Sequence, residues 1–587
     1  MTCARFVSTM LCIGLFLDSP VLAQQPASTD ESKAPSVRQR FFQRGVVAAD
    51  HRAASAAGVE ILKLGGNVID AAVATSFALS VVRPASCGIG GGGFMVIWNA
   101  DRREAVALDY RERAPQAATR DMYAGSDDGA AKLRESSRKG HLAVAVPGTV
   151  AGLCYALEHY GSLDLRTVMR PALDLARRGV PADRHQCETQ AAILESLEKS
   201  RGDLERFRSL HALYLNGGRR WKPGDRVRST QARVLELIAE RGADGFYRGP
   251  VAEALVAESQ RGGGLLTLDD LAETKPVIRP VLRGRFDRYD VITMPPPSSG
   301  GVALLESLNI LSAYEAVHPA RRLDRLGHNR TDYLHLLSEA MKHAFADRAE
   351  FLGDPDFSPV PVARLTSVEY AERLAKRVNI GQTGKSDSYG RYQPVDDAGT
   401  SHFCVIDQRG NAVACTETIN TRYGSYVVEP RFGILLNNEM DDFAARPGEP
   451  NAFGLIQSEA NAVGAGRKPL SSMTPTIVVQ DGRAAFALGA SGGPRIISAS
   501  LQVLLNLTRL EMSPAAAVAA PRIHHQWQPD DLLIEETLVE EHRESLEQRG
   551  HQVKSSTGLA AVQAVLRSVN GLAGASDQRK GGRPAGF

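Results

Sequence analysis

The sequence lacks three features that mark large classes of protein: a long apolar run, an excess of one charge and a regular cysteine pattern. No segment reaches the roughly 18 consecutive apolar residues that a membrane-spanning helix needs. Lys and Arg number 69 and Asp and Glu 67, which gives a formal net charge of +2, and the basic residues are spread along the chain. The composition therefore argues against a membrane span and against a nucleic-acid partner.

The cysteines and three suggestive motifs do not indicate a bound metal or cofactor. The 7 cysteines are irregularly spaced, unlike a disulfide framework or a zinc site, and Cys404 and Cys415 lie in apolar runs typical of a core. The glycine-dense stretch 88–93 has no following Lys-Ser/Thr, so it is not a phosphate loop. The His pair at 524–525 lacks a second ligand pair, and residues 354–356 lack the calcium-loop pattern. We expect no metal and no cofactor.

The beginning of the chain has the pattern of an export signal. Arg5 precedes a mostly apolar stretch at 6–17, and residues 21–23 (Val-Leu-Ala) are compact enough for a cleavage site. This pattern predicts a signal peptide at residues 1–23 and a secreted or periplasmic protein, with a disordered N-terminus or an uncleaved anchor as the alternative. Residues 24–40 are polar and rich in Ser, Ala, Pro and Lys, so we expect a flexible lead-in at residues 24–44.

The rest of the chain mixes helical and strand patterns, which is typical of an α/β protein. Apolar spacing predicts helices at 51–64, 71–82, 302–315 and 334–351, and a mainly helical region at 149–273. Alternation predicts hairpins at 94–109, 402–420 and 476–488. Residues 385–399 have no apolar period and are rich in Gly, Ser, Asp, Gln and Pro. They predict an exposed tether that ends where a hairpin begins.

The tether ends at Gly399-Thr400, a junction whose threonine could act as a nucleophile. A Thr hydroxyl is a weak nucleophile unless a base lies beside it. Cleavage before Thr400 would free an α-amino group within reach of that hydroxyl. Gly399 leaves its carbonyl uncrowded and tolerates the backbone that an attack requires. Taken alone, Gly-Thr is a common dipeptide, and the alternative is an ordinary strand start.

The motifs around this junction occur in a characteristic order. They include Thr-Ser-His-Phe at 400–403, Gly-Ile-Leu-Leu-Asn-Asn-Glu-Met-Asp-Asp-Phe at 433–443 and Pro-Leu-Ser-Ser-Met at 469–473. Others stand at 109–112, 146–149, 294–301, 347–348, 418–420, 492–493, 521–522 and 574–577. In this order, from about residue 45 to the C-terminus, the chain resembles the γ-glutamyltranspeptidase family.

The resemblance implies an N-terminal-nucleophile fold, a four-layer αββα sandwich with an additional helical region in the large subunit. It implies a precursor that cuts itself before Thr400 into a large subunit (45–399) and a small subunit (400–587), which remain together as a heterodimer. The implied reaction removes the γ-glutamyl group of glutathione and related compounds. Water, amino acids or dipeptides would accept it.

The resemblance also assigns roles to individual residues. Thr400 would be the nucleophile, Thr418 would hydrogen-bond its hydroxyl, and Gly492 and Gly493 would form the oxyanion hole. A γ-glutamyl group carries an α-carboxylate and an α-ammonium. The carboxylate would bind Arg111, Ser471 and Ser472, and the ammonium would bind Asn420, Glu439 and Asp442.

Two positions depart from the family pattern, and the first of them, in a lid loop, bears on the choice of substrate. Residues 445–454 resemble a lid loop, in which Phe453 replaces an aromatic residue with a hydroxyl, and Pro494 follows the glycine pair. One alternative is a glutaryl or cephalosporin-type acylase of the same fold. Glu439 argues against it, because a glutaryl group has no amine for that carboxylate. Another alternative is a binding protein that captures γ-glutamyl peptides without turnover; the presence of Thr400, Thr418 and both glycines argues against it.

Overall fold

Two antiparallel sheets of seven strands each lie at the centre of the computed structural model, which describes residues 39–123, 135–390, 399–444 and 458–587. The expected signal peptide, most of the lead-in, tether residues 391–398 and Phe453 lie outside these ranges. The first sheet has the order β1 (Phe41–Phe42), β20 (Gly571–Ser576), β19 (Ala561–Ser568), β15 (Arg483–Ser491), β14 (Thr476–Gln480), β9 (Tyr289–Thr293) and β8 (Leu282–Phe286). The second has the order β21 (Ala585–Gly586), β2 (Gly45–Ala49), β10 (Thr400–Asp407), β11 (Ala412–Thr418), β3 (Gly92–Asn99), β4 (Glu104–Tyr110) and β7 (Val277–Arg279).

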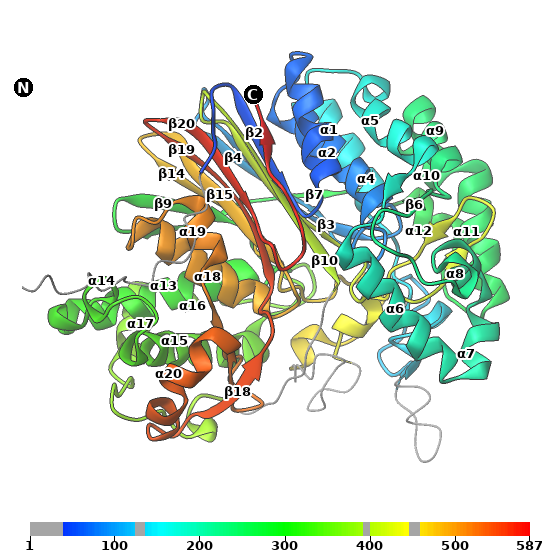
Figure 1. The fold of residues 1–587 in the computed structure, drawn as a ribbon. Helices are drawn as coiled ribbons and strands as arrows, with labels where there is room; N and C mark the ends of the chain where they lie inside the picture. Colours follow the sequence, from blue (N-terminus) through cyan, green and yellow to red (C-terminus); the bar gives the residue numbers. More distant parts are fainter. Residues whose placement is uncertain (1–38, 124–134, 391–398, 445–457) are drawn as a thin grey trace, which may run out of the picture. The chain divides into compact units, whose positions relative to one another are not determined.

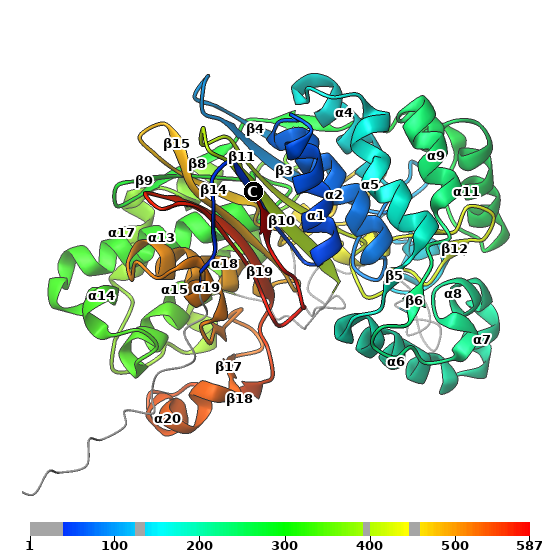
Figure 2. The ribbon, with the colours of Figure 1, turned by 45° about the horizontal axis from the view of Figure 1, so that its top comes forward.

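Helices cover the outer face of each sheet (Figures 1 and 2). Helices α1 (Arg52–Lys63) and α2 (Val68–Val82) pack on the second sheet. The first sheet is covered by α13 (Gly300–Val317), α18 (Arg495–Thr508) and α19 (Pro514–Ala519), and α15 (Thr331–Phe351) packs against α13. The order helix, sheet, sheet, helix confirms the four-layer sandwich that the resemblance implies.

The predicted helical region at 149–273 comes after α2 in the sequence, and its helices α4 and α5 pack against α2 (Figure 2). It contains α4 (Thr149–Tyr160), α5 (Leu165–Arg178), α6 (Arg184–Glu198), α7 (Arg201–Arg206), α8 (Arg208–Leu213), α9 (Ala232–Arg241), α10 (Asp244–Tyr247), α11 (Gly249–Arg261) and α12 (Leu268–Ala272). The remaining elements are α14 (Leu323–Leu326), α16 (Val362–Leu365), α17 (Val368–Ala375), α20 (Glu536–Glu547), β5 (Val180–Pro181), β6 (Arg226–Val227), β12 (Val428–Glu429), β13 (Ile434–Leu435), β16 (Ile523–His524), β17 (Asp531–Glu535) and β18 (Gln552–Ser556).

Strand β10 is buried on both faces because it lies inside the sandwich. Its side chains alternate with the period of two that a strand imposes. Cys404 and Ile406 belong to the core between the sheets, whereas Phe403 and Val405 belong to the core under α1 and α2. Cys404 and Cys415 are fully buried, which confirms their prediction as core residues.

Each sheet combines strands from both sides of the Gly399-Thr400 junction. In the second sheet, β10 pairs with β2 and β11 pairs with β3. In the first, β14 pairs with β9. A cut at the junction would therefore leave two polypeptides joined by the hydrogen-bond ladders of both sheets.

Regular structure begins earlier than predicted. Residues 24–44 are expected to be a flexible lead-in, but β1 lies inside this segment and pairs with Leu572 and Ala573 of β20. Phe42 of β1 is buried and belongs to the hydrophobic core between the sheets. The prediction was wrong for Phe41 and Phe42. The overall composition of a segment does not indicate that two apolar residues within it pair with the edge of a sheet.

Candidate active site

Thr400 and Thr418 lie opposite each other at the ends of β10 and β11. Their hydroxyl oxygens are 3.4 Å apart. The Thr418 hydroxyl donates to the main-chain carbonyl of Gly399 at 2.7 Å, and its oxygen accepts the N–H of Asn420 at 2.8 Å. Because the single proton of Thr418 is directed to Gly399, its oxygen can accept the proton of the Thr400 hydroxyl. The pair therefore places a hydroxyl beside the polarised carbonyl of the preceding residue.

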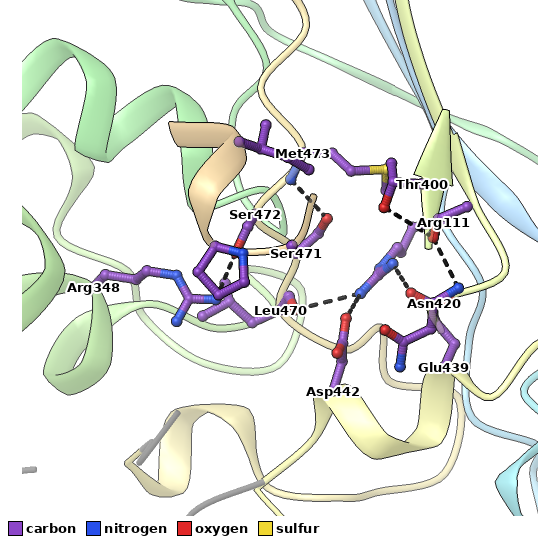
Figure 3. A pocket seen from close by; sticks show the side chains of 14 residues that line it. Arg111, Arg348, Thr400, Asn420, Glu439, Asp442, Leu470, Ser471, Ser472 and Met473 are labelled. Carbon is purple, nitrogen blue, oxygen red and sulfur yellow. Dashed lines mark hydrogen bonds and ion pairs between the residues drawn. The ribbon is translucent and has the colours of Figure 1, made fainter. Parts of the chain in front are cut away.

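Arg111 follows β4 and is the centre of a buried charge cluster (Figure 3). Its guanidinium pairs with Glu439 through Nη1 and with Asp442 through Nη2, the latter at 2.5 Å. Its Nε donates to the Pro469 carbonyl at 3.1 Å, and Nη2 donates to that of Leu470 at 3.3 Å. Burial disfavours the charge, but the neighbouring carboxylates, Glu439 foremost, hold the pKa of Arg111 above its ordinary value.

Three carboxyl groups share this guanidinium. Burial raises the pKa of Glu112 to about 7, and burial also raises the pKa of Glu439 and Asp442, in each case against the attraction of Arg111. Among the described residues, both carboxyl oxygens of Glu112 and Oε2 of Glu439 are buried and have no hydrogen-bond partner. The two expected ends of the substrate clamp, Arg111 on one side and Glu439 with Asp442 on the other, are therefore in direct contact in this structure.

Arg348, on α15, lies at the other side of the same pocket (Figure 3). Its Nη2 donates to the Ser472 hydroxyl at 3.1 Å, and its Nε donates to the Ser299 hydroxyl at 2.8 Å. Nη1 is buried and has no hydrogen-bond partner in the described part of the chain. Burial lowers the pKa of Arg348 to about 10, with Asp442 opposing this effect. A buried cation with neutral partners favours an anionic ligand.

Gly492 and Gly493 form the turn between β15 and α18. Their φ angles are +136° and +56°, which glycine adopts without a steric penalty. A Cβ on Gly492 would come within 2.9 Å of the Ala560 Cα. Pro494 follows as the N-cap residue of α18 and has no N–H to donate. The groups here that favour an anion are therefore the N–H groups of the glycine turn and the positive end of the α18 dipole.

The pocket brings most of the predicted site residues together. Gly492 lies beside it rather than among its lining residues, Gly399 reaches it through the bond to Thr418, and Phe453 lies outside the described residues. The lining residues are Arg111, Arg348, Thr400, Thr418, Asn420, Glu439, Asp442, Leu470, Ser471, Ser472, Met473, Gly493, Pro494 and Ile496.

Comparisons with known proteins show which family the chain belongs to. The profile of the gamma-glutamyltranspeptidase family matches residues 54–587. The chain belongs to this family. The glutathione hydrolase proenzyme of Escherichia coli K12 is 41% identical over 542 residues, which cover 92% of this chain and 90% of that protein. The acylase ACY 1 proenzyme of Pseudomonas sp. SE83 is 38% identical over 576 residues, or 97% of each chain.

Solved structures of similar proteins share the fold of this chain. The crystal structure of a cephalosporin acylase from Bacillus halodurans superposes with a TM-score of 0.81 at 26% identity, covering 96% of this chain and 99% of that chain. The Helicobacter pylori gamma-glutamyltranspeptidase structure gives 0.53 at 35% identity, covering 61% and 97%. As a member of the family, the chain is an enzyme of the hydrolase and transferase class. Within the described residues, no helix has both the length and the apolar character to cross a bilayer.

The sequence prediction gave no role to Arg348, which lines the pocket, or to Glu112, whose carboxyl group lies 3.8 Å from the Arg111 guanidinium. Both stand in motifs used for the resemblance, at 347–348 and 109–112. A usable signal was the charge of Arg348 inside a helix whose neighbours from 333 to 349 are all buried. A charged residue in such a stretch needs a partner or a ligand.

Proposed function

We propose that the chain is a proenzyme that cleaves itself between Gly399 and Thr400, and that the product is a γ-glutamyl hydrolase and transferase acting on glutathione and related compounds. The observation that carries the proposal is the Thr418 hydroxyl, which donates to the Gly399 carbonyl at 2.7 Å and lies 3.4 Å from the Thr400 hydroxyl. The names of the 41% identical relatives, which are glutathione hydrolase proenzymes, support it.

Self-cleavage follows from this contact. The Thr400 oxygen attacks the Gly399 carbonyl carbon, and the C–N bond breaks as the nitrogen takes up a proton, which leaves an ester between Gly399 and Thr400. The Thr418 hydrogen bond stabilises the charge that forms on the Gly399 oxygen. Water then hydrolyses the ester and frees the Thr400 hydroxyl and α-amino group. The products would be a large subunit that ends at Gly399 and a small subunit of residues 400–587.

The freed α-amino group then serves as the base for turnover. It accepts the proton of the Thr400 hydroxyl while the oxygen attacks the γ-carbonyl of the donor. The N–H groups of the Gly492-Gly493 turn stabilise the oxyanion. The leaving amine departs with a proton, and a γ-glutamyl ester remains on Thr400. Water releases glutamate, whereas the amino group of an amino acid or dipeptide gives a new γ-glutamyl amide.

The balance of charge in the pocket favours a γ-glutamyl donor over a glutaryl donor. Arg111 and Arg348 line a pocket with three buried carboxyl groups nearby, Glu112, Glu439 and Asp442, and burial raises the pKa of each of these carboxyl groups. An α-carboxylate with its α-ammonium adds no net charge to this buried site. A glutaryl group adds one negative charge and no donor for Glu439, which is unfavourable in a buried pocket.

The donor class is tested by assaying the purified, cleaved enzyme with γ-glutamyl-p-nitroanilide and glutaryl-p-nitroanilide. We expect a kcat/KM at least about 100-fold higher for the γ-glutamyl compound, because one buried unpaired carboxylate costs several kcal/mol. The Thr400→Ala variant is the control for background hydrolysis. Equal rates, or a preference for the glutaryl compound, would make the chain an acylase of the kind that some relatives are named for.

Arg348 should act on the carboxylate end of the donor. Its bond to Ser472 occupies an acceptor position of that hydroxyl, so the Ser472 proton is free to point at a carboxylate, and Nη1 can donate as well. We expect Arg348→Met to raise KM for γ-glutamyl-p-nitroanilide roughly 10- to 100-fold with a smaller change in kcat. Arg364→Met, a change of an exposed arginine on α16, is the matched control. Unchanged KM in a folded Arg348→Met enzyme would remove Arg348 from the site.

The pattern at residues 5–23 supports a secreted or periplasmic location, with cleavage of the signal after Ala23. Detection of the cleaved enzyme in the periplasmic fraction or medium of the expressing cell would support this location, and detection only in the cytoplasm would contradict it.

A further inference from the structure

Lys580 lies after β20 and buries its ammonium against the predicted nucleophile. Its Nζ hydrogen-bonds to the main-chain carbonyl oxygen of Thr400. It also reaches the hydroxyls of Ser401 at 3.4 Å and Ser491 at 3.3 Å. Asp50 completes the set with an ion pair at 2.7 Å. The resemblance assigned no role to this lysine.

These contacts join the two sheets where β10 of the second sheet begins and β15 of the first sheet ends. Thr400 and Ser401 begin β10 of the second sheet, and Ser491 is the last residue of β15 in the first sheet, directly before Gly492. One ammonium therefore fixes the main chain of the nucleophile relative to the turn that holds the expected oxyanion donors.

Lys580 is itself held in place. Its carbonyl accepts a bond from Arg83 Nη2 at 3.1 Å, and its N–H donates to the Asp577 carbonyl at 3.2 Å. The counter-ion Asp50 accepts a bond from the Gln563 side chain at 2.6 Å. A long, flexible side chain with fixed ends acts as a rigid spacer.

The ammonium also lies close to the nitrogen that self-cleavage would convert into an α-amino group. The nitrogen and carbonyl oxygen of one residue are about 3 Å apart in an extended chain, so the Lys580 ammonium lies within about 6 Å of the Thr400 nitrogen. A positive charge at that distance disfavours a second one. Asp50 reduces this effect without cancelling it, because Asp50 faces the ammonium and not the Thr400 nitrogen in the contacts that the structure shows.

We propose that Lys580 is a positioning residue, which holds the main chain of Thr400 against the oxyanion turn and keeps the freed α-amino group unprotonated near neutral pH. This inference rests on the proposed function, because it needs Thr400 to become N-terminal.

Other charged and titratable groups surround this site and are mostly paired with each other. Arg83 pairs with Asp183, and Asp577 pairs with Arg522 and Arg579. The groups from the neighbouring elements are Asp50, His51, Arg83, Cys87, Asp183, His185, Glu417, Arg422, Arg522, Asp577 and Arg579. Burial lowers the pKa of His51 to about 3 and that of His185 to about 2, so neither adds a positive charge near neutral pH.

The test compares cleaved enzymes carrying Lys580→Met, Lys580→Gln and Lys580→Arg by their pH profiles of kcat/KM with γ-glutamyl-p-nitroanilide. For Lys580→Met we expect a fall in kcat of roughly 10- to 100-fold, with KM changed less than about 3-fold. The acidic limb of the profile should move up by about one pH unit, because loss of the cation makes the α-amino group more basic. Lys580→Gln should show the same shift with a smaller fall in kcat, since its amide can still donate to the Thr400 carbonyl, and Lys580→Arg should keep the wild-type limb.

Lys554→Met is the matched control. Lys554 is an exposed lysine whose Nζ lies 2.6 Å from a carboxylate oxygen of Asp531, and it makes no contact with Thr400 among those that the structure shows. An unmoved acidic limb in both uncharged variants would overturn the proposal, as would a rise in KM at constant kcat. Failure of all three variants to fold would also overturn it and assign Lys580 to stability alone. Inactive wild-type enzyme would instead contradict the proposed function before any variant is compared.

Discussion

Thr400→Ala should leave the chain uncut and lower γ-glutamyl transfer at least about 10⁴-fold. The variant lacks the hydroxyl that attacks the Gly399 carbonyl, and it also lacks the nucleophile for the donor. The change removes a small side chain at the end of β10, so the sheet pairing with β11 and β2 should persist. Denaturing gels over time and N-terminal sequencing measure cleavage. In the wild type, the smaller band should begin at Thr400.

Thr400→Ser is the matched control for this prediction. It keeps the hydroxyl and the α-amino group and loses only a methyl group, so it should still be cleaved and keep activity within about 10- to 100-fold of the wild type. Normal cleavage of Thr400→Ala, or a small band that begins elsewhere, would place the nucleophile at another residue.

The architecture could be predicted where the sequence pattern is strong and local. The predicted helix at 51–64 is α1 (Arg52–Lys63), and the alternating run after Thr400 is β10 paired with β11. Both depend on side-chain period, which a single sequence displays directly. The alternation even assigns β10 residues to the two cores, since both faces of this strand are buried.

Element boundaries were less predictable because one residue can serve either neighbour. Asn67 lies in the gap between the predicted helices at 51–64 and 71–82, but it caps the second helix. Its side chain accepts the N–H groups of Ile69 and Asp70, so α2 begins at Val68 rather than near residue 71. The predicted tether shows the same limit. Ser386 accepts a bond from Trp527 Nε1 at 2.8 Å, and this pairing of distant residues has no local signature.

The site could be predicted from motifs, whereas its charge balance could not. Motif order brought Thr400, Arg111 and Asp442 together in advance, and all three line one pocket. The sequence did not indicate that Arg111 pairs directly with Glu439 and Asp442, or that Glu112 and Arg348 adjoin them. Such contacts depend on how segments far apart in the sequence meet, which no spacing rule encodes. The roles of these residues remain predictions that variants must test.

Arg111→Lys should raise KM for γ-glutamyl donors roughly 100-fold while the protein remains folded. The guanidinium makes bonds in several directions at once, to Glu439, Asp442 and the carbonyls of Pro469 and Leu470. A lysine keeps the charge that the buried carboxylates need, but it has no planar fork and cannot hold them and a donor carboxylate together. The loss should therefore fall mainly on donor binding, measured as KM against kcat with γ-glutamyl-p-nitroanilide.

The choice of lysine in this experiment separates binding from folding. Removal of the charge by Arg111→Ala would leave Glu439 and Asp442 buried without a cation, which costs about 3–5 kcal/mol and confuses the two effects. Arg113→Lys is the matched control, because Arg113 lies two residues further along and donates to the Asp270 carbonyl at 2.7 Å instead of lining the pocket. Equal KM values for Arg111→Lys, Arg113→Lys and the wild type would show that the donor carboxylate is bound elsewhere. The partly unpaired guanidinium of Arg348 would then be the first group to test.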